Sequence, residues 1–389
     1  MHKTIKDLTI LATLTLTLTL LIWLPHFLAI PNFFGLNFSN GFATIYRNFD
    51  GLEYVVIAKT FYHPNLIAGI PQTMSANYYA AHFPLYPALI LLLSGFLGFL
   101  KSMLFTSLLF TIFSVWAFYF LVRDFKLSAH PLFLSFVFLI LPARWVIVHS
   151  VGSAETIFIF FVISSLYFFL KFEKNSNFLN IVFSAIFGLG AQLTRPPGIL
   201  LFIALALFVH YKFYLERKTL GFKKAFLKHL RYFPYILIPI GLLWVFFLYS
   251  QTYGDFWAYF HSGDNIHLTL PPFQVFNKSQ FWVGEIWLED IIYIFILGFL
   301  GGLLLIKQKL YPLAFFTLTY LTASTLIAHR DIARYTLPIF PFLLIAFEKV
   351  LTSREFKIVL VIIGLAIYLY SQNFLIANVA PIPNLSIFN

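Results

Sequence analysis

The sequence predicts an all-α, polytopic membrane protein built as a bundle of about eleven transmembrane helices. Of its 389 residues, 60% are hydrophobic and only 11% are charged, whereas soluble domains are about 45–50% apolar and about 25% charged. Long apolar runs recur along the chain, and in lipid only helices or closed barrels satisfy their own backbone. The composition excludes a soluble enzyme. Cysteine is absent, which excludes disulfides and thiolate metal sites.

The spans are predicted from apolar runs long enough to cross about 30 Å of hydrocarbon. The run 8–30 follows a basic N-terminus but is too long for a signal peptide and lacks a cleavage site, so we expect an uncleaved first span. Residues 178–210 are too long for one crossing, and Arg195-Pro196-Pro197-Gly198 divides them into two spans. The expected spans are 8–30, 102–122, 131–148, 155–170, the two halves of 178–210, 234–251, 289–306, 311–328, 336–350 and 356–373.

One apolar stretch is too short to be a span. Only 13 residues lie between Pro87 and Lys101, so we expect an interfacial or re-entrant helix there. The prediction is one integral membrane domain over residues 1–389. Its parts are a first span (1–30), an outer loop with juxtamembrane helices and an acidic motif (31–101), spans two to six with a basic cytoplasmic loop (102–233), and spans seven to eleven with an outer loop at 252–288 (234–389).

The distribution of charge predicts the orientation. The chain has a net charge of +11, which in a soluble protein would indicate nucleic acid. With the N-terminus in the cytoplasm, 18 of the 26 Lys and Arg fall in cytoplasmic loops, seven of them between Lys212 and Arg231. This arrangement obeys the positive-inside rule. We therefore expect a multi-pass protein of the cell membrane with no nucleic-acid partner, whose functional loops are extracytoplasmic.

Acidic and aromatic residues form two clusters on the predicted outer face, where ionisable groups near lipid are costly and point to function. The first is FDGLEY, in which Asp50 and Glu53 have the spacing of a capping box. Asp50 could equally accept a proton from an incoming hydroxyl. The second is HFPLYP, with His82 and Tyr86, which would also suit an aromatic interfacial anchor.

Two further clusters lie at the ends of other spans. In HSVGSAET, Glu155 is either a charge at a helix start or a functional carboxylate. The cationic cluster combines Arg195 with HRDIARY, which contains Arg330, Arg334 and Tyr335. Arginine forks suit phosphate oxygens. The alternatives are snorkelling to headgroups or an ion pair between Arg330 and Asp331.

Histidine and tryptophan give weaker signals. The histidines and acids that could suggest a metal lack the spacing of a known motif, so we expect no metal; they are His63, His261, His267, Asp255 and Asp264. The aromatic residues of the loop 252–288 indicate an interfacial belt more than a surface for stacking sugars; they are Trp257, Trp282, Trp287, Tyr253 and Tyr259.

Five stretches carry a resemblance to a known family: FDGLEYVVIAKTFY at 49–62, HFPLYPALI at 82–90, LPARWVIVHSVGSAETIFIF at 141–160, GLGAQLTRPPGIL at 188–200 and RYTLPIFPFLL at 334–344. In this order they resemble the GT-C glycosyltransferases. The pattern is most similar to the PIG-V-like family of the second mannosyltransferase of GPI-anchor synthesis and its prokaryotic relatives. Phe49 stands where that family has a tryptophan, and SVGSAET stands in place of its Tyr-Thr-Glu-Ser run.

The resemblance implies an inverting sugar transfer on the extracytoplasmic face. The donor would be a polyprenyl-phosphate sugar, by resemblance mannose, and the acceptor a hydroxyl of a glycolipid or glycan, with membrane lipid around both. Asp50 would be the catalytic base and Glu155 a second catalytic carboxylate facing it. No cofactor or metal is implied. The implied substrate-binding residues are Glu53, His82, Tyr86, Arg195, Arg330, Arg334 and Tyr335.

Two other functions remain open from the sequence. A transporter or flippase for lipid-linked sugars would also contain many spans and broken helices. Such proteins usually show inverted repeats and ionisable residues at the membrane midplane, whereas the polar clusters here fall mostly at span ends. A catalytically inactive assembly subunit on the same fold is the second alternative.

Overall fold

The computed structural model describes residues 2–71, 74–263, 268–283, 288–381 and 384–388. Within them the protein is all-α, and the only β-type pairings are three isolated bridges. Seven stretches are long and apolar enough to cross a membrane. They are α1 (His2–Phe27), α6 (Phe99–Asp124), α9 (Ala154–Asn175), α11 (Gly198–Leu220), the run Phe222–Thr252, α14 (Glu289–Lys307) and α19 (Arg354–Ala377). A multi-pass membrane protein is therefore confirmed.

The expected span 131–148 is not one straight helix. It consists of α7 (Pro131–Ile140) and α8 (Ala143–His149), which are bent by 77° relative to each other. Leu141 is extended, as a residue before proline prefers to be, and Pro142 cannot continue a helix because it has no backbone N–H. Counting this pair as one broken span brings the total to eight, not the expected eleven.

Three other expected spans form helices that are shorter than a full crossing. They are α10 (Phe178–Thr194), α15 (Tyr311–Ser324), and a run made of α16 (Ile332–Tyr335), η4 (Leu337–Ile339) and α17 (Phe340–Ala346). Crossing about 30 Å takes roughly 20 residues, and α10 and α15 have 17 and 14. Because α15 and α17 are largely buried, their apolar composition reflects packing between helices as well as contact with lipid.

The run Phe222–Thr252 has three parts, namely α12 (Phe222–His229), η2 (Leu230–Ile236) and α13 (Leu237–Thr252). The prediction of a break between two helices at residues 195–198 is confirmed, because α10 ends at Thr194 and α11 begins at Gly198. An added Cβ on Gly198 would lie 2.4 Å from the Cα of Gln192. Only glycine allows the two helix ends to come this close.

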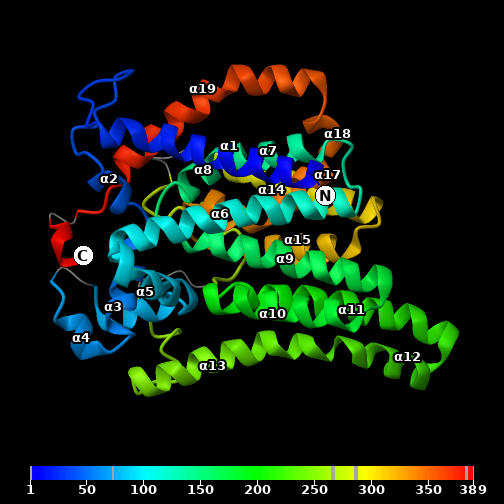
Figure 1. Ribbon diagram of the computed structural model, residues 1–389. Helices are drawn as coiled ribbons and strands as arrows, with labels where there is room; N and C mark the ends of the chain where they lie inside the picture. Colours follow the sequence, from blue (N-terminus) through cyan, green and yellow to red (C-terminus); the bar gives the residue numbers. More distant parts are fainter. Residues whose placement is uncertain (1, 72–73, 264–267, 284–287, 382–383, 389) are drawn as a thin grey trace.

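The short helices between the first two spans gather at one end of the bundle, beside the C-terminus (Figure 1). As expected, the stretch before Lys101 forms a helix of only 13 residues, α5 (Leu85–Leu97). The other elements of this end are α2 (Ala43–Tyr46), α3 (Gly51–Thr60), α4 (Pro64–Ala68), η1 (Ala76–Ala81) and η5 (Leu385–Phe388), and η3 (Gln274–Phe276) lies in the loop after α13.

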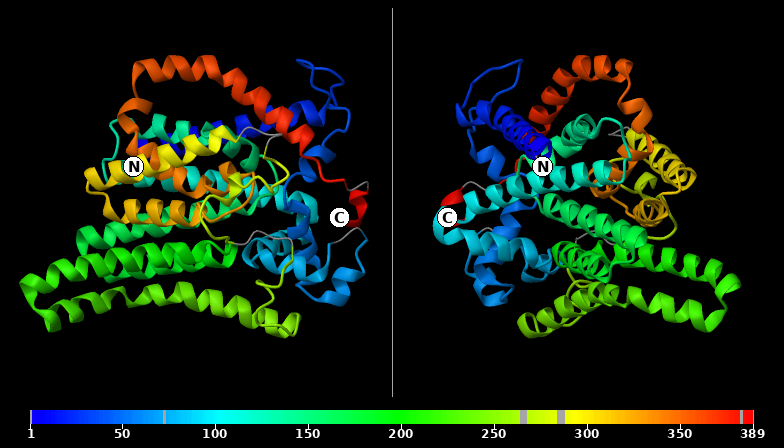
Figure 2. Two further views of the ribbon diagram at one scale, coloured as in Figure 1. Left: turned by 180° about the vertical axis from the view of Figure 1, so that it is seen from behind. Right: turned by 45° about the vertical axis from the view of Figure 1, so that its right-hand side comes forward.

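The opposite end carries the N-terminus, α12 and α18 (Glu348–Leu351), as Figures 1 and 2 show. Side-chain bonds join the chain segments there: Arg123 donates to Thr4 Oγ1 at 3.0 Å, and Ser128 donates to Glu348 at 2.6 Å. The basic loop and the acidic motif are thus at opposite ends of the molecule. That the basic end faces the cytoplasm stays a prediction.

A close approach of two backbones positions the acidic motif. An added Cβ on Gly51, the first residue of α3, would lie 3.0 Å from the carbonyl oxygen of Gly152. This contact sets the start of α3 against the turn that precedes α9. Asp50 and Glu155, which are far apart in the sequence, are brought to the same place because both flank this contact.

Candidate functional site

One arginine joins the two predicted catalytic carboxylates. Arg334 Nη2 donates to Asp50 Oδ2 at 2.6 Å, and its Nε donates to Glu155 Oε1 at 2.6 Å. Arg195 Nη1 lies 3.2 Å from the same Glu155 oxygen. The four groups come from the start of α3, the start of α9, the α10–α11 turn and α16. The structure therefore unites four residues that the sequence had assigned to three separate clusters.

Asp50 occupies the N-cap position of α3, but its side chain makes no capping hydrogen bond. The predicted capping box with Glu53 is therefore wrong. The carboxylate turns to Arg334 instead, since a charge-assisted bond is stronger than a bond to a neutral amide. The preceding residue, Phe49, has a φ of 50°, a left-handed conformation that is uncommon outside glycine. Such backbone strain often accompanies functional sites.

Glu155 is held from several sides at the start of α9. Ser153 is the N-cap of this helix, and its hydroxyl donates to Glu155 Oε2 at 2.6 Å. The side chain of Glu155 is only 1% exposed, and those of Arg334 and Arg195 are 8% and 12% exposed. A buried carboxylate is tolerated here because two guanidinium groups and a hydroxyl satisfy it.

Asp50 is the accessible carboxylate of the pair, because its side chain is 34% exposed. It lines a cavity of about 790 Å³ at the end of the bundle that carries α2 to α5. Five of the predicted site residues line this cavity, and they are Asp50, His82, Arg330, Arg334 and Tyr335. Within the described part of the chain Oδ1 of Asp50 has no hydrogen-bond partner, so it can accept one from a molecule in the cavity.

The other four predicted residues do not line the cavity. Glu155 and Arg195 lie behind Arg334. Tyr86 is fully buried, and its hydroxyl donates to the carbonyl of Met103 at 2.9 Å, which is a structural role. Glu53 is half-buried, and its Oε2 is buried without a hydrogen-bond partner.

Sequence reasoning missed Arg144 as a site residue. It lines the cavity, and its guanidinium lies 4.0 Å from the ring centre of Phe374. Asp331 pairs with Arg144 at 3.1 Å and not with Arg330, so the expected Arg330–Asp331 pair is wrong. The Nε and Nη1 atoms of Arg144 are buried and have no hydrogen-bond partner. In the sequence Arg144 is marked only by its place two residues after Pro142 in the stretch LPARW, which does not by itself indicate a binding role.

Two aromatic rings separate the arginines of the cavity wall. Phe49 and Phe374 stack with ring centres 5.5 Å apart. Arg334 lies over Phe49 at 4.3 Å, and Arg144 lies over Phe374. Cation–π contacts of this kind hold a guanidinium in place without using its N–H donors. Phe49 thus supports Arg334 through its ring.

Burial and neighbouring charges shift the pKa values of three ionisable groups at or beside the cavity. Burial raises the pKa of Asp50, but the charge and hydrogen bond of Arg334 together with the nearby His82 lower it more, so the pKa is below its usual value and Asp50 is ionised at neutral pH. Burial and the charge of Asp50 together raise the pKa of Glu53 to about 7. Burial, with the nearby Arg334 and Arg330, lowers the pKa of His329 to about 4.

The described residues contain no group of three histidine or acidic side chains arranged to hold a metal ion. Asp255 Oδ2 and His261 Nδ1 do approach to 2.6 Å, on an exposed loop. Three candidates of this region, namely Asp264, His267 and Trp287, lie outside the described residues.

The fold and the site together define a multi-pass α-helical membrane protein with a charged cavity at one end of its bundle. Comparison with models of known protein families and with curated proteins gives no match to this chain.

Proposed function

We propose that this protein is a membrane glycosyltransferase that moves a sugar, by resemblance mannose, from a polyprenyl-phosphate donor to a hydroxyl of a glycolipid or glycan. The observation that carries the proposal is the position of Asp50 on the cavity wall, as an ionised carboxylate with one oxygen that has no hydrogen-bond partner among the described residues. Besides Arg334, three exposed or partly buried arginines line the same cavity. These three are Arg47, Arg144 and Arg330. A base and several cations are what this chemistry requires.

In the proposed reaction, Oδ1 of Asp50 accepts the proton of the acceptor hydroxyl. The hydroxyl oxygen forms a bond to the anomeric carbon while the bond from that carbon to the phosphate oxygen breaks, and the electron pair leaves with the phosphate. Phosphate is a good leaving group, so no general acid is needed. A single displacement inverts the anomeric configuration. Arg334 fixes Oδ2 and so orients Oδ1 toward the cavity.

The structure changes which arginines we assign to the donor phosphate. Arg195 and Arg334 were expected to bind it, but both form ion pairs with the buried Glu155, and Arg334 also pairs with Asp50. Arg144 has two unsatisfied N–H groups, which a phosphate oxygen would satisfy. We therefore assign phosphate binding to Arg144, with Arg330 on the same cavity wall, and we assign Glu155 and Arg195 a positioning role.

The prenyl chain of the donor needs an apolar path beside the cavity. A groove of about 980 Å³ runs between α1 and α6, lined by side chains such as Leu20, Leu24 and Leu104. Tyr46 lines this groove, and the next residue, Arg47, lines the cavity. The end of α2 thus lies between an apolar groove and a cationic cavity. This is the arrangement that a molecule with a lipid tail and a phosphate head would need.

The test is a donor screen on the purified full chain in lipid vesicles. Several polyprenyl-phosphate sugars, including mannose, are supplied with a membrane lipid extract as acceptor, and products are identified by mass. We expect one donor to give a glycolipid heavier by one sugar. If instead a polyprenyl-phosphate sugar crosses the bilayer and no sugar is transferred to any acceptor, the protein is a flippase for lipid-linked sugars and the proposal is wrong.

A further inference from the structure

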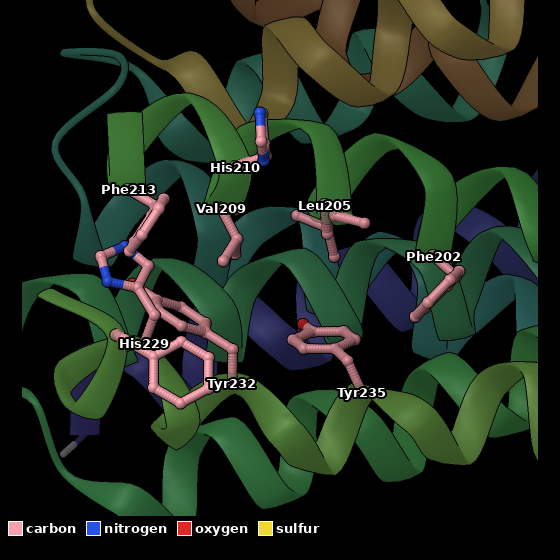
Figure 3. Close-up of a pocket in the computed structure, with 10 residues that line it drawn as sticks. Phe202, Leu205, Val209, His210, Phe213, His229, Tyr232 and Tyr235 are labelled. Atoms are coloured by element: carbon pink, nitrogen blue, oxygen red, sulfur yellow. The ribbon is translucent and has the colours of Figure 1, made fainter. Parts of the chain in front are cut away.

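A second pocket lies at the opposite end of the molecule from the charged cavity. It has a volume of about 320 Å³ and lies between α11, α12 and η2. Figure 3 shows side chains of α11, among them Leu205 and Val209, facing Tyr232 and Tyr235 of η2. The lining is almost entirely apolar and aromatic. It is therefore suited to a hydrocarbon chain and not to a sugar or a free anion.

The surface around this pocket is strongly apolar for a loop. Five large side chains of α12 and η2 are between 48% and 67% exposed, and they are Phe222, Phe226, Leu227, Leu230 and Phe233. Lysines alternate with them along the same short helix, FKKAFLKH. A segment with exposed rings on one side and bases on the other lies in the headgroup region of a bilayer. The pocket therefore opens where lipid headgroups and acyl chains meet.

Two lysines near the pocket, one on α11 and one on α12, are already paired with acids. Lys212 Nζ lies 2.6 Å from Glu173, and Lys228 Nζ lies 2.9 Å from Glu216. Tyr232 donates to the same Glu173, which ties the pocket wall to α9. Lys212 and Lys228 are therefore engaged by acids and are not available to a ligand.

Three other bases remain available. Lys223, Lys224 and Arg231 are exposed, and within the described residues none of them has an acidic partner. His229 lines the pocket itself. Its Nδ1 bonds the carbonyl of Ala225 at 2.8 Å, and its Nε2 is buried with no hydrogen-bond partner. A polar group at the head of a bound lipid would satisfy this atom.

We propose that the pocket between α11, α12 and η2 is a binding site for an anionic phospholipid. One acyl chain enters the pocket, and the headgroup phosphate lies among Lys223, Lys224 and Arg231. The two features complement a single ligand, because the apolar pocket requires a hydrocarbon chain and the unpaired bases require a negative charge. A neutral lipid would satisfy only the first, and a soluble anion only the second. The proposal is independent of the proposed transferase activity.

The test measures lipid binding to the full chain in detergent by native mass spectrometry. Dioleoyl phosphatidylglycerol is titrated against dioleoyl phosphatidylcholine, which has the same chains and no net charge. We expect clear preference for phosphatidylglycerol. The triple variant Lys223→Gln, Lys224→Gln, Arg231→Gln should lose about tenfold or more in affinity for phosphatidylglycerol, as for loss of charge-assisted hydrogen bonds to a phosphate.

The matched control removes the same charge from the same end of the molecule. Lys349→Gln, Arg354→Gln, Lys357→Gln also deletes three exposed bases, around α18 and the start of α19. This variant should bind phosphatidylglycerol as the unaltered chain does. Equal losses in the two triple variants, or equal binding of the two lipids by the unaltered chain, would overturn the proposal.

A second pair of variants tests the pocket without touching charge. Ala206 lines the pocket, whereas its neighbour Leu207 does not and is 49% exposed. Ala206→Trp fills the pocket and should abolish the preference for dioleoyl over dihexanoyl phosphatidylglycerol, whereas Leu207→Trp should leave it intact. An unchanged chain-length preference in Ala206→Trp would overturn the assignment of the acyl chain to this pocket.

Discussion

Replacing Glu155 by glutamine should destabilise the protein more than any equally small change at the cavity surface. Glu155 is 1% exposed and pairs with Arg334 at 2.6 Å and with Arg195 at 3.2 Å. Removing one partner of a buried ion pair typically costs about 3–5 kcal/mol. Glutamine keeps the shape and an acceptor oxygen, and Arg334 keeps its bond to Asp50, so we expect a loss of about 3 kcal/mol, at the lower end of that range.

The comparison variant is Asp50→Asn. The side chain of Asp50 is 34% exposed, and Arg334 would still pair with Glu155 in this variant. Solvent screening should therefore limit the loss in the free energy of unfolding to about 1 kcal/mol or less. The assay is unfolding of the purified chain in mixed detergent micelles, with the free energy of unfolding compared among variants. The double variant Glu155→Gln, Arg334→Gln should lose less than the sum of its single losses, because the two residues are coupled.

The result that refutes this reasoning is equal stability of Glu155→Gln and Asp50→Asn. It would mean that Glu155 contributes no more than an accessible carboxylate does. Strict additivity in the double variant would equally contradict the ion pair that we describe.

Three further predictions concern the cavity and the topology. Arg144→Gln should raise the KM for the donor about tenfold or more with a smaller effect on kcat, as for loss of a charge-assisted bond to phosphate, and a purely structural role would not separate the two constants in this way. Because its folded pKa is raised to about 7, Glu53 contributes most to stability at low pH and loses this contribution as the pH rises toward 7. The thermal stability of Glu53→Gln relative to the unaltered chain should therefore increase as the pH rises from about 5 to about 7, and a difference that does not change with pH would contradict the raised pKa. In intact cells an impermeant thiol reagent should label Ser279→Cys and spare Leu220→Cys, since the native chain has no cysteine; the opposite pattern would reverse the predicted orientation.

The sequence predicted the fold class and most helix positions well, because apolar runs and proline breaks are local signals. The break at residues 195–198 is an example, since two consecutive prolines cannot continue a helix. The number of spans was overpredicted for a physical reason. In α15 the apolar residues pack against neighbouring helices, and hydropathy does not distinguish such a helix from one that faces lipid.

The pairing of charges could not be predicted in the same way. The sequence singled out Asp50, Glu155, Arg195 and Arg334, but their pairing depends on the contact of Gly51 with the backbone of Gly152, which is tertiary. The capping box at Asp50 is a second case in which a local signal does not decide the outcome. Local spacing favoured it, and a distant arginine outcompeted it.

The cavity wall shows the limit of motif reasoning most clearly. No motif around Arg144 in the sequence indicates phosphate binding, so it is not among the predicted site residues. Its importance follows from the bend between α7 and α8, which places it at the cavity beside Asp331.

The most direct test of the central claim is the initial rate of sugar transfer by the unaltered chain and by Asp50→Asn, both reconstituted in vesicles with the donor selected by the screen. Loss of a positioned general base typically lowers the rate by about 10²–10⁴-fold. We predict a loss of this size while the variant retains its folded structure and its affinity for the donor. A folded Asp50→Asn protein that transfers sugar at the unaltered rate would contradict the assignment of Asp50 as the base.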